Sequence, residues 1–248
     1  VIALALSLKL PTFVSANYKF MEKRNSMGIF DWVLILGVVL CNIIYAVSTS
    51  EYDIIGFIAA ISGIVCVVLA AKGNVWNFLF GTIQVTLYAY ISFKSTAYGN
   101  AAVNALYYLP MQFVGLWQWR KRGASAQESL KARRLSMPQL IIVAAVCVVC
   151  TVILALLLKY SDASQPWIDA FTTVLCVIAQ ALMTMAFVEQ WYLWIIFNVF
   201  TVVMWISFVI QGTAHSVPML IMYVFYLMNS VNGLISWRKL AAKGSLKG

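Results

Sequence analysis

The sequence predicts an all-α polytopic membrane protein, and two features carry that prediction. The chain has 248 residues, of which 63% are hydrophobic and only 10% are charged, whereas a soluble domain has about 45–50% apolar and about 25% charged residues. The apolar residues form eight segments of about 18–24 residues, each long enough to cross the ~30 Å hydrocarbon core of a bilayer. The net charge of +9 does not indicate nucleic-acid binding, because the basic residues lie between the apolar segments.

The segments follow one another with mostly short connections. Residues 1–29 have an apolar start that is interrupted by Lys9 and Pro11 and is too short to span; we predict that they form a cytoplasmic or interfacial segment. The eight predicted spans are residues 30–48, 54–71, 75–93, 99–119, 138–159, 167–188, 191–210 and 214–237. Residues 120–137 form a polar, basic loop, and residues 238–248 are predicted to form a cytoplasmic tail.

The Lys and Arg residues predict which side of the membrane each connection faces. If the N-terminus is cytoplasmic and all eight segments cross, all but two of the 17 basic residues lie inside, the exceptions being Lys94 and Lys159. Acidic residues such as Asp53 and Asp169 then lie outside. Because basic residues concentrate in cytoplasmic connections, we predict that both termini are cytoplasmic.

The chain also repeats itself. At one constant shift, Trp76 matches Trp194, Tyr108 matches Tyr226, Gly115 matches Gly233, and Trp119-Arg120-Lys121 matches Trp237-Arg238-Lys239. The two repeats, 53–119 and 167–237, each contain three predicted helices and run in the same direction, so that one further crossing, 138–159, must join them. We therefore predict a 3+1+3 arrangement of parallel repeats with 30–48 as an accessory N-terminal helix. Parallel repeats are one known design of alternating-access transporters.

The functional prediction centres on residues 191–205. In an α-helix, Trp191, Trp194, Asn198 and Trp205 fall within about 60° of one another. An unpaired amide in hydrocarbon costs several kcal/mol, so the Asn198 side chain is expected to face protein, water or a ligand. An interfacial anchor explains Trp191 equally well but explains neither Asn198 nor Trp205. We interpret this face as directed at a ligand.

Other predicted helices carry similar stripes of amide and aromatic side chains. With those of 191–205, they give these candidate substrate-binding residues: Gln84, Tyr88, Asn104, Tyr108, Gln112, Gln180, Trp191, Trp194, Asn198, Tyr226 and Asn229. The alternative is helix–helix packing through amides and small residues, which explains Asn77, Thr173 and Thr184 equally well and the glycines of these helices better. Five helices that turn amides and rings inward nevertheless offer more polar surface than pairing requires.

Charged residues are absent from the middle of every predicted span. All eight acidic residues lie in connections or at span ends, and the one histidine, His215, lies near a helix end. Ion-coupled pumps normally need an intramembrane ionisable residue and an anionic substrate needs a basic partner, so both are disfavoured. A neutral or singly cationic aromatic molecule fits, because Trp and Tyr rings make cation–π contacts and amides bind hydroxyl and amide groups.

The five cysteines all lie inside apolar spans and do not indicate a metal or redox site. Cys147 and Cys150 form a C-x-x-C pair, but no His or acidic residue flanks it. Packing against lipid is therefore favoured over metal or redox chemistry. We predict no catalytic residue, no metal and no cofactor.

Two motifs resemble a known family. The W-x-x-W-x-x-x-N element (Trp191, Trp194, Asn198) and the helix ends Gly-Leu-Trp-Gln-Trp-Arg (115–120) and Gly-Leu-Ile-Ser-Trp-Arg (233–238) are similar to those of the Pnu vitamin transporters. The resemblance covers roughly 53–239. It implies facilitated diffusion of nicotinamide riboside across the bacterial inner (plasma) membrane, a fold related in design to the SWEET sugar facilitators, and a homotrimer. It also implies that a cytoplasmic riboside kinase traps the substrate.

Three alternatives remain open. The same family contains transporters of thiamine and riboflavin, so another vitamin is the first alternative. An intramembrane lipid hydrolase or transferase is remote, because the spans lack the acid–base groups that such chemistry needs. A substrate-binding subunit that docks to a separate motor is less consistent with two matched halves.

Overall fold

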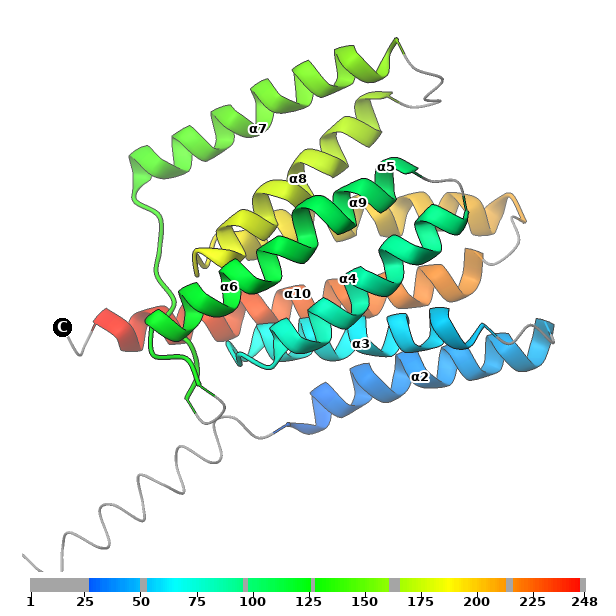
Figure 1. Cartoon of the computed structure of the whole chain (residues 1–248), viewed down its shortest axis with the longest axis horizontal. Coiled ribbons are helices and arrows are strands. Elements are labelled where there is room, and N and C mark those ends of the chain that lie inside the picture. Colours follow the sequence, from blue (N-terminus) through cyan, green and yellow to red (C-terminus); the bar gives the residue numbers. More distant parts are fainter. Residues whose placement is uncertain are drawn as a thin grey trace, which may run out of the picture.

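A computed structural model of the chain describes residues 27–49, 53–95, 98–125, 128–160, 166–212 and 216–245. Most of these residues are helical, and the extended pairing among them is an isolated bridge between Arg133 and Phe187. The predicted segment 1–29 falls almost entirely outside the described residues, as does the end of the predicted tail 238–248. Figure 1 shows the helices in chain order.

The helices lie close to the predicted spans. They are α2 (Ile29–Thr49), α3 (Ile54–Ala71), α4 (Asn77–Lys94), α5 (Tyr98–Val103), the π-helix η1 (Asn104–Tyr108), α6 (Leu109–Lys121), α7 (Met137–Leu158), α8 (Pro166–Thr184), α9 (Gln190–Ile210) and α10 (Ser216–Ser245). Local capping sets two of the starts. The Asp53 carboxylate accepts a hydrogen bond from the Gly56 amide at 2.9 Å, and Gln139 accepts one from the Ser136 amide at 2.9 Å in a capping box.

Six of the described helices are long and apolar enough to cross a membrane: α2, α3, α7, α8, α9 and α10. The chain is therefore a multi-pass membrane protein. Helix α4 and the run α5–η1–α6 coincide with two further predicted spans but are not among these six. Polar residues such as Asn77 and Gln84 make α4 less apolar, and α5, η1 and α6 are each shorter than the 18 residues required of a single spanning helix.

The structure differs from the prediction at two helices. The span predicted at 99–119 is not one regular α-helix, because η1 interrupts it and the Leu109 amide donates to the Asn104 carbonyl. Pro110 follows directly and has no N–H for the regular i to i−4 ladder, which favours such an irregular turn. Helix α10 also continues past Trp237 to Ser245, so the first part of the predicted tail is helical.

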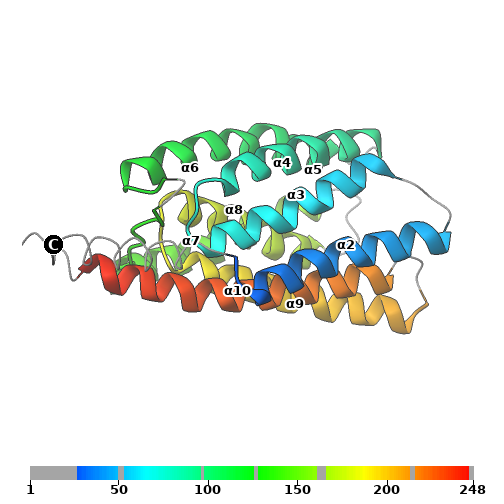
Figure 2. The same ribbon diagram turned by 90° about the horizontal axis from the view of Figure 1, so that it is seen from below.

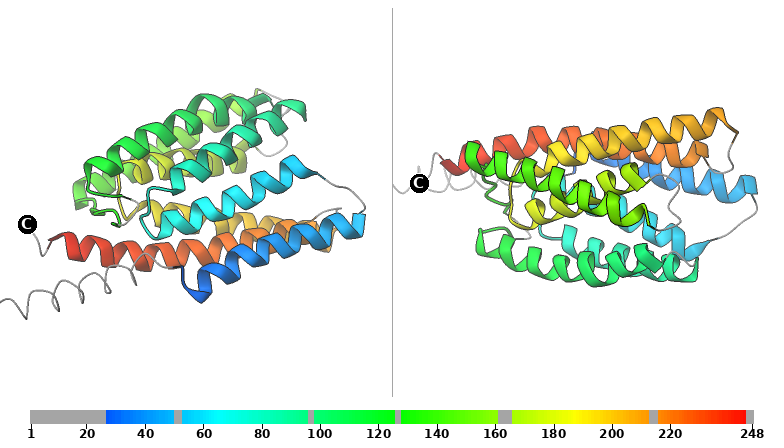
Figure 3. Two further views of the ribbon diagram at one scale, coloured as in Figure 1. Left: turned by 60° about the horizontal axis from the view of Figure 1, so that its bottom comes forward. Right: turned by 90° about the horizontal axis from the view of Figure 1, so that it is seen from above.

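The helices pack side by side as one bundle (Figures 1 and 2). Helix α3 packs against α2, α4 and α10, and α9 packs against α8 and α10. Helix α6 bridges α4 and α8. Helix α7 packs on α8 at one edge of the bundle, and α2 lies at the opposite edge in Figure 1. Figure 3 shows the same bundle from two other sides.

One end of the bundle is filled by aromatic side chains, and we call it the aromatic end. Phe78, Trp119, Trp191 and Trp237 are buried there in one hydrophobic cluster. The Trp119 indole N–H donates to the Met183 carbonyl at 2.9 Å, and the Trp237 indole N–H donates to the carbonyl of Ala70 at 2.8 Å. Each indole thereby adds a further donor to a carbonyl near a helix end, since the Met183 and Ala70 carbonyls also accept from the Ala186 and Gly73 amides.

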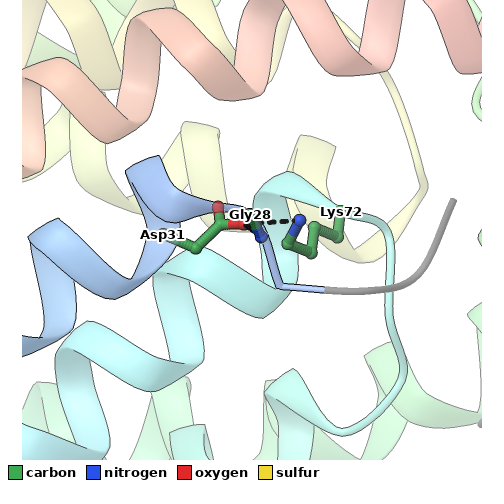
Figure 4. Close-up of polar contacts among 3 residues, drawn as sticks. All are labelled: Gly28, Asp31 and Lys72. Atoms are coloured by element: carbon green, nitrogen blue, oxygen red, sulfur yellow. Dashed lines mark hydrogen bonds and ion pairs between the residues drawn. The ribbon is translucent and has the colours of Figure 1, made fainter. Parts of the chain in front are cut away.

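Two further contacts hold the same end together. The Asp31 carboxylate of α2 accepts a hydrogen bond from the Gly28 amide at 2.6 Å and forms an ion pair with Lys72, at the end of α3, at 2.7 Å (Figure 4). Asp31 is 4% exposed, so this pair is screened little by solvent. Residues 128–135, which we call the strap, are hydrogen-bonded to the turns 72–76 and 185–189.

Candidate substrate site

Polar side chains from five elements meet in the interior of the bundle. Gln84 of α4 and the Tyr226 hydroxyl of α10 both lie against Gly63 of α3, where an added Cβ would be 3.3 Å from the Gln84 Cγ and 3.2 Å from the Tyr226 oxygen. Tyr88 lies near Tyr226 and Tyr223. The structure thus brings together three of the predicted residues, Gln84, Tyr88 and Tyr226.

Helix α8 and η1 complete this interior group. Tyr108 of η1 lies close to Cys176 of α8, and the Tyr107 hydroxyl donates to the Val177 carbonyl at 2.6 Å. Cys176 also lies near Tyr223. The irregular turn of η1 is therefore attached to α8 at the level of the tyrosines, which places Tyr108 in the same group as Tyr226.

Asn198 faces α10 rather than lipid. Its Nδ2 donates to the Ser230 hydroxyl at 3.0 Å, and the Ser230 hydroxyl donates to the Tyr226 carbonyl at 2.8 Å. Asn198 is 4% exposed. About two turns further along α9, the Trp205 ring is stacked on Tyr223 with a centroid distance of 6.5 Å and an interplanar angle of 19°.

The two tryptophans of the W-x-x-W element have different surroundings. Trp191 is buried in the aromatic cluster, 5.9 Å from the Trp237 ring by centroids, and its ring fills the space beside Gly233. Packing is therefore the clearer role of Trp191. Trp194 is only partly buried and lies between that cluster and Phe197, whose ring centroid is 6.1 Å away.

Several predicted amides donate from one end of the side chain to a backbone carbonyl. The Asn229 Nδ2 donates to the Val67 carbonyl of α3 at 2.9 Å. Asn104 and Gln112 donate to carbonyls one turn back in their own helical run, at 2.9 and 3.3 Å. Asn77 likewise donates to the Asn74 carbonyl at 2.6 Å, which favours a packing role for it.

Other ends of these amides have no partner in the part of the chain that the structure describes. The enclosed unpartnered atoms include the Gln112 Oε1, the Gln180 Nε2, the Asn229 Oδ1 and the Trp205 Nε1. An enclosed polar group without a partner is costly and usually indicates a bound molecule or water. The interior therefore offers uncharged donors and acceptors together with phenol and indole rings.

No group of three metal-binding side chains occurs among the described residues. Within the described helices, the Asp, Lys and Arg residues lie in the first or last turns, or beyond Trp237 in α10. The interior can thus bind an aromatic, hydrogen-bonding molecule, but it offers no charged group to a phosphate.

A family model described as nicotinamide mononucleotide transporter matches residues 53–239. The chain belongs to this transporter family. It is 42% identical over 192 residues to the nicotinamide riboside transporter PnuC of Neisseria mucosa, a match that covers 76% of this chain and 73% of that protein. It is 32% identical to the PnuC of Haemophilus influenzae over 191 residues, covering 76% and 81% of the two chains.

A solved structure of the same family has a similar fold. A crystal structure of the vitamin B3 transporter PnuC matches with a TM-score of 0.73 and 37% identity, over 89% of this chain and 97% of that one. The resemblance to the Pnu transporters that the W-x-x-W-x-x-x-N element indicated is therefore confirmed. The family is one of transporters, not one of enzymes.

Sequence reasoning missed three members of the interior group in this transporter. Tyr223 lies three residues before Tyr226, and Ser230 lies four residues after it, so that all three share one face of α10. This spacing could have identified both residues. Cys176 lies in an apolar span, and a cysteine without polar neighbours in sequence gives no signal that it lies among polar side chains.

Proposed function

We propose that this chain transports nicotinamide riboside into the cell for NAD synthesis. The relatives in Neisseria and Haemophilus carry that name. The observation in this chain that supports the proposal is an interior of tyrosines, tryptophans and amides without a charged side chain among the described residues of mid-span. Nicotinamide riboside has a cationic pyridinium ring, a carboxamide and ribose hydroxyls. Aromatic rings bind the first, and amides bind the others.

The riboside is a better candidate than the mononucleotide named by the family model. The two molecules differ by a phosphate, which proteins bind with Arg, Lys or the amides of a helix N-terminus. In the described helices those cations lie at span ends, away from the Gln84, Tyr88 and Tyr226 group. Thiamine is a second cationic aromatic vitamin and is the alternative substrate.

We propose facilitated diffusion through alternating access as the mechanism. Uphill transport coupled to protons normally uses an intramembrane ionisable residue, and the described mid-span residues offer none. Net uptake would then depend on a cytoplasmic riboside kinase, which adds a phosphate that the interior is poorly suited to bind. The protein itself is proposed to have no enzymatic activity, because the described mid-span residues include no acid–base pair.

The proposed architecture is the SWEET-like 3+1+3 arrangement, with repeats 53–119 and 167–237, the linking helix 138–159 and the accessory helix 30–48. It is supported by reciprocal contacts at the aromatic end: Trp119 donates to the first helix of the second repeat, and Trp237 donates to the first helix of the first repeat. We propose that all eight predicted spans cross the bacterial inner membrane, with both termini cytoplasmic, and that three copies assemble. Reporter fusions after Arg122 and at the C-terminus should then read cytoplasmic, and the mass of the purified protein should be that of a trimer.

Substrate choice is tested by binding titrations of the purified protein with nicotinamide riboside, nicotinamide mononucleotide, thiamine and riboflavin. We expect the riboside to bind at least tenfold more tightly than the others, and Trp194→Ala to weaken it by about 1–3 kcal/mol through loss of stacking. Thr173→Val, on an exposed side chain of α8, is the matched control. Tighter binding of thiamine would contradict the proposed substrate.

The mechanism is tested in vesicles that contain the purified protein. Nicotinamide riboside should reach the same concentration inside and outside, and a protonophore should leave the initial rate unchanged. Enclosing a riboside kinase with ATP should convert this equilibration into accumulation of the phosphorylated product. Accumulation of unmodified riboside above the external concentration would exclude facilitated diffusion.

A further inference from the structure

We infer that Ser230 fixes the orientation of the Asn198 amide, so that Asn198 presents a hydrogen-bond acceptor and not a donor to the substrate. The inference rests on the proposed function, since it specifies which kind of substrate group Asn198 binds. Ser230 acts here as a positioning residue, because it contacts Asn198 rather than the ligand.

Ser230 connects α9 to α10 through a short chain of hydrogen bonds. The Ser230 oxygen lies 2.8 Å from the Tyr226 carbonyl, one turn earlier in α10, and 3.0 Å from the Asn198 side chain on α9. A carbonyl can only accept, so the one proton of the Ser230 hydroxyl is donated to Tyr226. The hydroxyl can then only accept from Asn198. The Asn198 atom that faces it must therefore be the Nδ2, because only that end of the amide can donate.

The opposite end of the amide is thereby set as an acceptor. The Asn198 Oδ1 has no hydrogen-bond partner among the described residues, and it is not one of the fully enclosed unpartnered atoms. It therefore differs from the Oδ1 of Asn229, which is enclosed while its Nδ2 is bound to the Val67 carbonyl. Asn198 shares its helix face with Trp194. A molecule against that face meets an aromatic ring and a fixed carbonyl oxygen.

A fixed acceptor selects a donor on the substrate. In nicotinamide riboside the donors are the carboxamide NH₂ and the ribose hydroxyls. An analogue in which the relevant donor is replaced leaves a polar oxygen unpaired, which weakens binding by roughly tenfold to a hundredfold. A freely turning amide would instead offer either end and would discriminate little.

The experiment compares three ligands on the full-length purified protein: nicotinamide riboside, 3-acetylpyridine riboside, which has a methyl group in place of the NH₂, and nicotinamide deoxyribosides. In the wild type, one class of analogue should bind at least tenfold more weakly, and its identity tells whether the carboxamide or a ribose hydroxyl is the donor. In Ser230→Ala that ratio should fall to about threefold or less. Ser230→Thr keeps the hydroxyl and should restore the ratio.

A second measurement does not depend on the ligand or on a stable variant. In wild-type protein with ¹⁵N-labelled asparagine, one Asn198 side-chain amide proton should be shifted downfield and protected from exchange by its bond to Ser230. An unprotected amide, or full ligand discrimination in Ser230→Ala, would overturn the inference. A wild-type protein that binds no nicotinamide riboside would contradict the proposed function instead, and the amide resonance would still decide the orientation of Asn198.

Discussion

The turn between α3 and α4 and the turn between α8 and α9 share one backbone form but differ in the residue that adopts it. Gly73 has a φ of 67° in the first turn, and Ala186 has a φ of 66° in the second. Both turns are hydrogen-bonded to the strap: the Leu130 amide donates to the Gly73 carbonyl at 2.9 Å, and the Arg133 amide donates to the Ala186 carbonyl at 3.0 Å. The two halves of the protein are therefore built alike at this end.

The difference shows how the second turn tolerates strain. A left-handed conformation costs a non-glycine residue roughly 1–2 kcal/mol, which Gly73 avoids and Ala186 does not. Arg133 makes further contacts with the second turn. Its carbonyl accepts from the Val188 amide at 3.0 Å, and its Nε donates to the Met185 carbonyl at 3.1 Å. Its guanidinium lies 3.9 Å from the Phe187 ring centroid. Glycine lets the first turn adopt this conformation without strain, whereas the contacts with Arg133 stabilise the second turn.

The placement of Arg133 has an electrostatic cost. Partial burial, and then the nearby Arg122, lower the pKa of the Arg133 guanidinium. The guanidinium nevertheless remains charged at neutral pH, because the ordinary pKa of arginine is so high. Its contacts with the second turn therefore combine a charge-assisted hydrogen bond with a cation–π contact.

The same equivalence continues into the helices. Phe78 fills the space beside Gly115, and Trp191 fills the space beside Gly233. Phe78 and Trp191 are separated along the chain by the same number of residues as Gly73 and Ala186, whereas Gly115 and Gly233 are separated by slightly more. The constant shift that pairs Trp76 with Trp194 and Gly115 with Gly233 in the sequence therefore does not pair Gly73 with Ala186 or Phe78 with Trp191.

The largest effect is expected from filling these two glycine positions. Gly233→Val would place side-chain atoms inside the space of the Trp191 indole, and Gly115→Val inside that of Phe78. Overpacking costs about 1–3 kcal/mol or more, and both variants should be destabilised, because Phe78 and Trp191 each pack against a further buried ring, Trp119 and Trp237 respectively. Thermal unfolding in detergent measures both. Gly99→Val, at a position with no neighbour within 4 Å, is the control, and equal stability of all three variants would refute the packing described.

The next largest effect concerns the two reciprocal indole hydrogen bonds. Trp119→Phe and Trp237→Phe each keep a ring in the cluster but remove the indole donor, so that the Met183 or the Ala70 carbonyl keeps its backbone donor, the Ala186 or the Gly73 amide. Loss of one such hydrogen bond costs about 0.5–1.5 kcal/mol. If the halves are equivalent, the two variants should lower the unfolding midpoint by similar amounts. Trp117→Phe, at an exposed ring of α6, serves as the control. A loss in only one of the buried variants would show that the halves differ in energy.

The sequence alone predicted most of this helical arrangement. Apolar length located α2, α3, α8 and α9 within a few residues, because burial in lipid requires long uninterrupted apolar segments. It did not predict η1, since a π-turn depends on how Pro110 is accommodated locally. It also could not predict the strap, because a polar, basic segment gives no periodic signal of its contacts with two distant turns.

The sequence also predicted only part of the candidate site. Helical spacing grouped Gln84 with Tyr88, and Tyr226 with Asn229, on single faces. It could not show that the Asn229 amide donates to the Val67 carbonyl, or that Trp191 packs beside Gly233, because both contacts join different helices. Spacing within a helix identifies a face, but only the packing of helices decides which side chains of that face remain available.

A smaller effect is expected from exchanging the residues of the two turns. Ala186→Gly removes the left-handed strain of roughly 1–2 kcal/mol but adds about 0.4–1 kcal/mol of unfolded-state entropy, so a net stabilisation of about 0.5–1 kcal/mol is expected. Gly73→Ala should destabilise, and its Cβ would lie 3.1 Å from side-chain carbons of Leu130 and Leu240. The difference in unfolding midpoint between each variant and the wild type measures the strain, and a destabilised Ala186→Gly would show that the turn is not strained.

The sharpest test of the comparison comes from Arg133→Lys. Lysine keeps the charge and the backbone hydrogen bonds of the strap but loses the Nε donor to Met185 and the planar contact with Phe187. We expect a loss of about 0.5–1.5 kcal/mol. If these contacts hold Ala186 in its strained form, the loss should shrink when Ala186→Gly is already present, since a relaxed turn needs less support. A double-mutant cycle measures that coupling. Combining Arg133→Lys with Gly73→Ala provides the control pair, because the first turn is bonded to Leu130 and not to Arg133. Additive losses in both cycles would mean that the strap stabilises the two halves without relieving the strain of either.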